Sequence, residues 1–230
     1  MKPIPKDPGS FGVLTPGHKA VLEIFFALKE SEDFCLSGGT ALAEYYLGHR
    51  RSFDLDFITR RDDLVPTFSR RLEQALAEKF TTLVPRRFLS FAELQTQIGA
   101  EQVKIHLAYD SPFRLAAPVK VGKVLVNNYL DLITDKLLAF YGRSEPRDAI
   151  DLYFILTQEK VDFWELSECA REKDRGYDFY WMAAALEKIQ ALPDQINRWP
   201  VELIKPVDPR DIKALFRKLA DEIFQKITRK

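Results

Sequence analysis

Cysteine is scarce in this chain. Only Cys35 and Cys169 occur among 230 residues, and they lie far apart without the spacing of a metal site. This excludes a disulfide-rich scaffold of the kind found in small secreted proteins, and a zinc site built from paired cysteines. We therefore expect both cysteines to be packing residues in a protein of a reducing compartment.

The chain also lacks an excess of charge of either sign. Thirty-four Lys and Arg residues balance 34 Asp and Glu residues, so the formal net charge is zero. A neutral molecule has no overall electrostatic field that would hold nucleic acid or an anionic membrane without specificity. Any contact with nucleic acid must therefore be local.

Long apolar runs are missing as well. No stretch approaches the roughly 18 apolar residues of a membrane span, and residues 1–14 lack the apolar core of about 7 to 15 residues that a signal peptide has. We expect a cytoplasmic protein with no membrane contact. Its hydrophobic content of 46% is enough for a sizeable core.

The first half of the chain mixes helical and strand patterns. Apolar residues recur at helical spacing in some segments and alternate with polar residues in others. The predicted elements are helices over 16–30, 40–48 and 64–79, and strands over 33–37, 52–59, 81–90, 101–109 and 123–127.

The second half has helical periodicity throughout. The predicted helices cover residues 129–143, 146–158, 161–173, 177–192 and 208–227. No repeat, low-complexity tract or long linker separates the halves. We therefore expect an α+β fold, in which a mixed sheet with flanking helices over residues 1–127 is followed by a C-terminal helical bundle over residues 128–230.

A glycine pair opens the most informative stretch, "SGGTALAEYYLGHRRSFDLDF" (37–57). Between a strand and a helix, Gly38 and Gly39 let backbone amides approach an anion, because no Cβ intervenes and the helix N-terminus carries partial positive charge. Ser37 and Thr40 could add hydroxyl donors. A phosphate is a candidate ligand, although such a turn taken alone is more often only a connection.

Two aspartates follow on the next predicted strand. Alternation places Asp54 and Asp56 on one face, and Phe53, Leu55 and Phe57 on the other. Paired carboxylates repel each other unless a cation neutralises them, and Mg²⁺ is commonly shared between one or two carboxylates and substrate phosphates. A solvated polar face is the alternative. With the glycine turn 15 residues upstream of Asp54, the pattern favours a nucleoside triphosphate bound with Mg²⁺ or Mn²⁺.

The order of strand, Gly-Gly, helix and aspartate pair resembles the nucleotidyltransferases of the DNA polymerase beta superfamily. The string "LSGGTALAEYYLGHRRSFDLDF" is specifically similar to the AbiEii/AbiGii toxin family. A second string, "DKLLAFYGRSEPRDAIDLYFI" (135–155), resembles that family's other signature. Together the similarities cover roughly residues 15–160, and the last seventy residues carry none of them.

The resemblance implies an enzyme that transfers a nucleoside monophosphate from an NTP to an acceptor hydroxyl and releases pyrophosphate. Residues 1–127 would be the nucleotidyltransferase core, and the helical part would complete the active-site cleft. Relatives modify the acceptor end of tRNA, so tRNA is the expected acceptor. The resemblance also implies a toxin of a toxin–antitoxin or phage-defence pair, with a separately encoded antitoxin as its partner.

The resemblance also assigns roles to individual residues. Asp54 and Asp56 would bind the metal, Ser52 would line the triphosphate pocket, and Lys136 and Asp151 would complete the active site.

Other positive charges are candidates from the residues themselves. Lys136 and Arg143 are two helical turns apart and could both neutralise phosphate, although an ordinary exposed lysine is the alternative. His49 and Arg50 could contact the nucleotide, or could complement the C-terminal dipole of the preceding helix.

One position departs from the superfamily. A third carboxylate is usual on a later strand, but the strand that looks equivalent here offers His106. His106 could serve as base or ligand, or it could be a surface histidine. If activity is lost, the protein would be a nucleotide-binding regulatory module. A third possibility is an enzyme that attaches a nucleotide to a hydroxyl of another protein.

Overall fold

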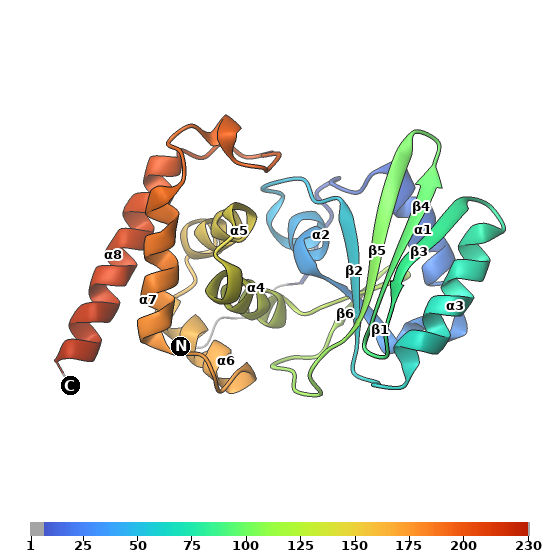
Figure 1. Cartoon of the computed structure of the whole chain (residues 1–230), viewed down its shortest axis with the longest axis horizontal. Helices are drawn as coiled ribbons and strands as arrows, with labels where there is room; N and C mark the ends of the chain where they lie inside the picture. Colours follow the sequence, from blue (N-terminus) through green and yellow to red (C-terminus); the bar gives the residue numbers. More distant parts are fainter. Residues whose placement is uncertain (1–6, 230) are drawn as a thin grey trace. The chain divides into compact units, whose positions relative to one another are not determined.

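The computed structural model describes residues 7–229, which fall into two compact units. The sheet unit comprises residues 7–48 and 52–132, and the helical unit comprises residues 49–51 and 133–229. Figure 1 labels their helices and strands.

A seven-stranded mixed sheet is the centre of the sheet unit. Its order is β3-β4-β5-β2-β1-β7-β6. The strands are β1 (Phe34–Ser37), β2 (Asp54–Thr59), β3 (Thr81–Arg87), β4 (Phe91–Ile98), β5 (Glu101–Tyr109), β6 (Val119–Val121) and β7 (Val124–Val126). β2 pairs antiparallel with β1 and parallel with β5. The α+β expectation is confirmed.

Helices lie on both faces of this sheet. Figure 1 shows α1 (Pro16–Phe25) and α3 (Leu64–Ala77) on one face, and α2 (Gly38–Leu42) on the other. α2 continues directly into a π-helical turn, Ala43–Leu47, which ends at Gly48. The helix predicted over 16–30 is too long, because α1 stops at Phe25 and a 3-10 turn, Lys29–Asp33, follows.

Aromatic packing holds α1 and α3 against β1 and β2. Phe25 stacks on Phe57 with ring centroids 3.7 Å apart, and Phe68 packs 4.6 Å from Phe34. Leu55 and Phe57 are fully buried, as their alternation predicts. Phe53, by contrast, is 52% exposed. It lies just before the strand, because β2 begins only at Asp54.

Two strands of the sheet were not predicted. β4 lies between β3 and β5, and β6 forms a short hairpin with β7. In β4, Ala92, Leu94 and Thr96 are buried and alternate with more exposed residues. This period of two is the signal that should have identified β4.

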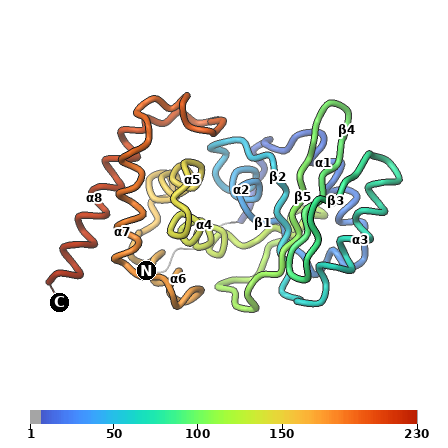
Figure 2. Tube along the Cα trace, viewed as in Figure 1, coloured from blue at the N-terminus to red at the C-terminus, as the bar shows by residue number. Residues whose placement is uncertain are grey.

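The helical unit contains five α-helices within the described residues, as the periodicity predicts. They are α4 (Tyr129–Arg143, of which Ile133 onward belongs to this unit), α5 (Pro146–Thr157), α6 (Phe163–Lys173), α7 (Phe179–Lys188) and α8 (Pro209–Thr228). Figure 2 shows α7 and α8 lying side by side. The Phe140 and Phe216 rings pack 5.2 Å apart in the core. Between residues 7 and 229, no helix has the length and apolar character required to cross a membrane.

Three residues from earlier in the chain complete the helical unit. Arg50 forms an isolated antiparallel bridge with Leu203. The His49 carbonyl accepts hydrogen bonds from the Ile204 and Lys205 amides at 2.9 and 3.0 Å. Backbone pairing therefore fixes the segment that carries the His49 and Arg50 side chains.

Candidate active site

The glycine turn and one of the aspartates are in direct contact in the sheet unit. Ser37 ends β1 and pairs in register with Asp56 of β2. Gly38 follows with φ +69°, and a Cβ at this position would overlap the Asp56 carboxylate oxygen Oδ2. Both the backbone conformation and the close approach therefore require glycine.

Hydrogen bonds fasten this turn to its neighbouring strands. The buried Thr40 hydroxyl donates to the Asp54 carbonyl at 2.6 Å, and the side-chain amide of Asn127 donates to the Ser37 hydroxyl at 3.2 Å. Within the described residues, the side chain of the N-cap residue Ser37 makes no hydrogen bond to the amides that follow it. The Thr40 hydroxyl thus joins the turn to β2.

Asp54 and Asp56 share one face of β2. Both are partly exposed, whereas Leu55 between them is buried. In the parallel pairing with β5, Lys104 lies opposite Asp54, and His106 lies opposite Asp56. Within the described residues, the Asp54 carboxylate has no hydrogen bond or ion pair.

His106 is a partner of Asp56. Its Nδ1 atom lies 2.9 Å from Asp56 Oδ1, and because a carboxylate only accepts, Nδ1 carries the hydrogen. This hydrogen bond raises the pKa of His106 above its ordinary value, against the lowering effect of burial, with smaller contributions from the Asp54 and Glu93 charges. The imidazole therefore belongs to a polar row across the sheet, and is not an isolated surface histidine.

Asp151 is the hub of a buried ionic cluster in the helical unit. This carboxylate, with no exposed surface, accepts from Arg50 Nε and Nη2 at 2.6 and 2.9 Å, and from His49 Nε2 at 2.6 Å. Lys136 Nζ lies 2.8 Å from it. Burial alone would raise the pKa of Asp151, but the Arg50 and Lys136 charges and the hydrogen bonds outweigh it and hold that pKa well below 3.8.

The sequence did not predict this role for His49 and Arg50. Both are buried, with exposures of 0% and 5%, and both bind Asp151. Burial lowers the pKa of His49, and its Nε2 donates to Asp151. The only signal in the sequence was a His-Arg pair directly after Gly48. Gly48 has a left-handed backbone and ends the helical run.

Lys136 and Arg143 meet at a second buried carboxylate. Arg143 binds Asp148 with two hydrogen bonds, of 2.6 and 2.9 Å, and Lys136 Nζ lies 3.6 Å from the same carboxylate. The two cations therefore share a face of α4, as their spacing indicates. The Arg143 side chain is 43% exposed and the Lys136 side chain only 9%, so Arg143 is the more accessible.

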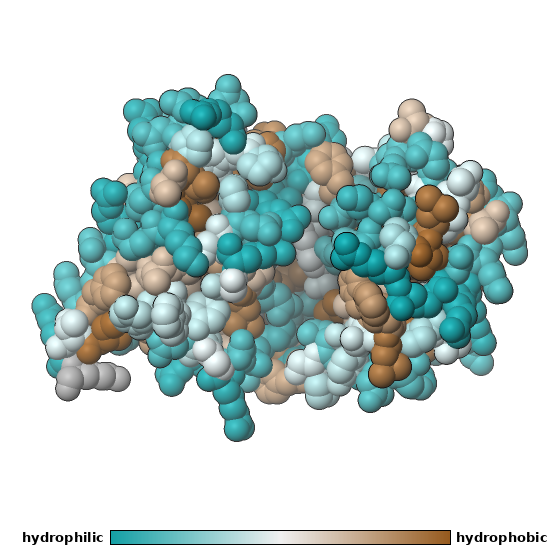
Figure 3. Space-filling model, in the orientation of Figure 1, coloured by the Kyte–Doolittle hydropathy of each residue, from teal (hydrophilic) through white to brown (hydrophobic). Residues whose placement is uncertain are grey.

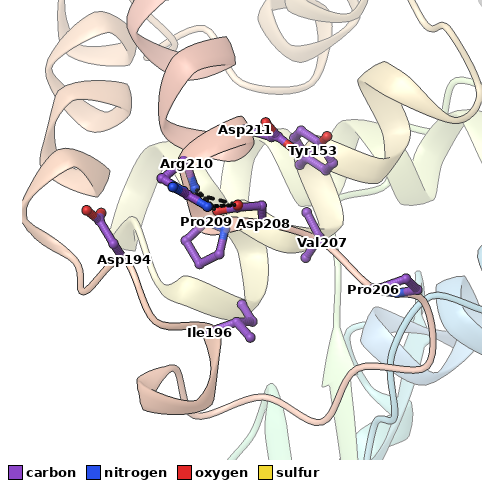
Figure 4. Close-up of a pocket in the computed structure, with 9 residues that line it drawn as sticks. All are labelled: Tyr153, Asp194, Ile196, Pro206, Val207, Asp208, Pro209, Arg210 and Asp211. Atoms are coloured by element: carbon purple, nitrogen blue, oxygen red, sulfur yellow. Dashed lines mark hydrogen bonds and ion pairs between the residues drawn. The ribbon is translucent and has the colours of Figure 1, made fainter.

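A separate hollow of about 470 Å³ lies within the helical unit at the start of α8. Figure 4 shows the nine residues that line it, including Arg210 hydrogen-bonded to Asp208. A second lining carboxylate, Asp194, is paired with Lys213. Arg210 is the only cation of the lining, and its pairing makes this hollow unsuited to a triphosphate.

Comparison with known families identifies the chain. A model described as nucleotidyl transferase AbiEii toxin, type IV toxin–antitoxin system, matches residues 20–229. The chain belongs to the AbiEii nucleotidyltransferase toxin family. It is therefore a nucleotidyltransferase, and membership in a type IV system implies an antitoxin partner and a nucleoside triphosphate substrate.

This AbiEii protein is also similar to individual chains. An uncharacterized protein of Aquifex aeolicus is 28% identical over 164 residues, which cover 70% of this chain and 76% of the relative. A Helicobacter pylori chain solved as a candidate nucleotidyltransferase matches with a TM-score of 0.58 and 17% identity, covering 94% of this chain and 98% of that one. MenT4, a nucleotidyltransferase toxin from Mycobacterium tuberculosis, matches with a TM-score of 0.57 and 16% identity, covering 89% and 82%. At such identities the structural matches show a shared fold.

Proposed function

We propose that this AbiEii family member transfers a nucleoside monophosphate from an NTP to a hydroxyl at the 3′ end of tRNA, in a reaction that depends on Mg²⁺ or Mn²⁺. The observation that supports this is the contact of Asp56 with the Gly38 turn. It brings a carboxylate beside the backbone amides that would hold the triphosphate, with Asp54 on the same face of β2.

The two aspartates fit a divalent cation. Asp54 has no partner within the described residues, and Asp56 is bound only on one side, by His106. Mg²⁺ prefers oxygen ligands and is usually held by one or two carboxylates together with phosphates and water. Among residues 7–229 no group of three metal-binding side chains occurs, so substrate and water oxygens would supply the other ligands. A cation bound here would neutralise phosphate charge and stabilise the departing pyrophosphate.

The remaining predicted site residues keep their proposed roles. The amides of Gly38 and Gly39 hold the phosphates, with Ser37 and Ser52 beside them. Lys136 and Arg143 stay proposed phosphate ligands on the family resemblance.

Asp151, which is fully buried, acts in this proposal as a positioning residue. It holds Arg50 and Lys136 in place through its ion pairs and does not touch the substrate.

The reaction exchanges one phosphorus–oxygen bond for another. The acceptor oxygen bonds to the α-phosphorus, and the bond between the α-phosphorus and its bridging oxygen breaks. Pyrophosphate leaves with that electron pair. The hydroxyl proton passes to Nε2 of His106, because Nδ1 already carries the hydrogen that binds Asp56.

Labelling tests the proposal. Purified protein is incubated with labelled NTPs, Mg²⁺ and total RNA, and labelled tRNA is expected. Asp54→Asn should abolish labelling, whereas Asp62→Asn, which changes an exposed aspartate, should not. A wild-type protein that labels no RNA would contradict the proposal. Label on protein alone would instead indicate a protein-modifying enzyme.

His106 motivates the second candidate, a regulatory module without turnover, because it stands where a third carboxylate is usual. That candidate predicts calorimetric binding of NTP without release of pyrophosphate. Any steady pyrophosphate release would exclude it.

A further inference from the structure

Strand order indicates where the acceptor lies, given the proposed function. β2 carries the two aspartates and lies between β1 and β5. The glycine turn that would hold the triphosphate follows β1. In an in-line displacement, the attacking and leaving oxygens lie on opposite sides of the phosphorus. Pyrophosphate on the β1 side therefore requires an acceptor hydroxyl on the β5 side.

The sheet continues on that side through β5, β4 and β3. Asp54 pairs with Lys104, Lys104 with Gln95, and Gln95 with Leu83. In the row that contains Asp56, His106 pairs with Glu93, and Glu93 with Arg86. Because paired residues project to the same face, these two rows extend the face of the aspartates to the edge of the sheet. Phe91 lies on the same face of β4, two residues before Glu93. We name this surface the acceptor platform: Leu83, Arg86, Phe91, Glu93, Gln95, Lys104 and His106.

The acceptor platform is open, whereas the opposite face is covered. α3 packs on β3, β4 and β5 from the other side, where Leu94 and Ile105 are fully buried. On the platform, Lys104 is exposed, Leu83 is 62% exposed, and the Arg86 side chain is 65% exposed. Figure 3 shows apolar side chains exposed among hydrophilic ones over β3 and β4. An exposed apolar group on a polar sheet face is available to a ligand.

An aromatic ring lies next to the proposed base. The Phe91 and His106 rings are 5.7 Å apart at 37° to one another, and both are partly exposed. A planar nucleobase can stack on such a ring without sequence preference. A base stacked on Phe91 would place its ribose hydroxyls close to His106.

Positive charge on the platform suits a phosphate backbone. Lys104 is exposed and has no ion pair within the described residues, although it lies opposite Asp54. Arg86 approaches Glu93 only to 3.8 Å, and Gln95 donates to the same carboxylate at 2.8 Å. Glu93, the one acidic residue of the acceptor platform, is thus already paired with Arg86 and Gln95. The chain has no net charge, so these local cations are what could attract RNA.

We infer that the acceptor platform docks the single-stranded 3′ end of an RNA acceptor. Phe91 stacks with the terminal base, and Lys104 and Arg86 bind the adjoining phosphates. This inference rests on the proposed function and specifies the subsite for its acceptor.

Steady-state kinetics with purified tRNA tests the inference. Phe91→Ala and Lys104→Ala should each raise the KM for tRNA about tenfold, because each removes one stacking or phosphate contact. Calorimetric binding of a non-hydrolysable NTP should not change. Phe91→Tyr, which keeps the ring, should remain close to wild type, while Phe91→Leu, which keeps only apolar packing, should resemble Phe91→Ala.

Matched controls come from the same unit. Phe113→Ala removes a ring that is 41% exposed in a loop, and Lys120→Ala removes an exposed lysine from β6 at the far edge of the sheet. Both controls should keep the wild-type KM for tRNA. Equal losses in the controls and the platform variants would overturn the inference.

Two further outcomes separate this inference from the proposed function. If the wild type labels tRNA and both platform variants keep its KM, the acceptor platform is wrong and the proposed function stands. If the wild type labels no RNA, the proposed function fails and the inference fails with it.

Discussion

The His106 Nδ1 atom lies 2.9 Å from Asp56 Oδ1, across the parallel pair of β5 and β2. On its other side Asp56 touches the Gly38 turn, where a side chain would not fit. One carboxylate is therefore held between the candidate phosphate-binding turn and the His106 imidazole. The two neighbours of Asp56, His106 and Gly38, can therefore be replaced one at a time to test their roles.

Replacing His106 by asparagine tests the imidazole as the base. The Asn amide can still donate to Asp56, but it has no basic nitrogen. We expect His106→Asn to lower kcat by about 10²- to 10⁴-fold with little change in the KM for NTP. Rapid-quench measurement of pyrophosphate release checks this. An unchanged kcat would assign the proton transfer to another group.

Replacing Asp54 separates catalysis from stability. Asp54 has no side-chain partner within the described residues and is partly exposed. Asp54→Asn should therefore leave the free energy of unfolding within about 0.5 kcal/mol of wild type, and should lower kcat/KM by at least about 100-fold through loss of a metal ligand. Urea unfolding and NTP turnover measure the two effects. A variant with wild-type turnover would contradict the metal site.

Gly38→Ala should displace Asp56. The added methyl group would overlap the carboxylate, and the backbone φ of +69° is strained for alanine by roughly 1–2 kcal/mol. Gly99→Ala is the matched control, because φ there is +61° with nothing within 4 Å. Both variants should lose thermal stability through the backbone strain, Gly38→Ala more because of its overlap with Asp56, but only Gly38→Ala should lose NTP turnover. Equal activity in the two would mean that Asp56 tolerates the methyl group.

Asp151→Asn should destabilise the helical unit. The substitution leaves the Arg50 and Lys136 charges buried without their carboxylate. Breaking a buried ion pair in this way costs about 3–5 kcal/mol. Asp221→Asn, which changes an exposed residue of α8, should cost no more than about 0.5 kcal/mol. Chemical denaturation compares them, and a small loss for Asp151→Asn would show that the cluster contributes little.

Acid should destabilise the protein in part through His49. Burial lowers the pKa of His49 in the folded state, and Asp151, Arg50 and Lys136 are the charged groups that face it. The unfolded imidazole binds a proton below about pH 6.5, and the folded one only at a lower pH. Its contribution is therefore complete above that pH and is lost as the pH falls. Between pH 7 and 5, the free energy of unfolding should fall more steeply for wild type than for His49→Gln; parallel curves would contradict this.

Several parts of the site were predictable because they depend on neighbours in the chain. Alternation placed Asp54 and Asp56 on one face of β2, and the glycine pair marked the end of β1. The contact between Gly38 and Asp56 is consistent with both, since Ser37 and Asp56 are register partners. Phe53 is exposed although it continues the alternation, because alternation does not show where pairing with β1 and β5 begins.

The helices of the helical unit were predictable from the sequence, but the ionic cluster around Asp151 was not. Periodicity predicted α4 and α5 and placed Lys136 and Arg143 on one face. It did not predict that Arg50, 101 residues before Asp151, would bind this carboxylate. That contact depends on the pairing of residues 49–51 with the segment before α8.

The amino-acid sequence by itself determined the local elements of this protein: the period-two face with two acids, the glycine turn, the helical second half and the family signatures. Such features arise from residues a few positions apart, whose spacing sets which side chains share a face. Only the tertiary structure decided that β5 lies beside β2, that His106 binds Asp56 from 50 positions away, and that His49, Arg50 and Lys136 bind Asp151. These contacts depend on strand order and helix packing, which join segments that no local pattern relates.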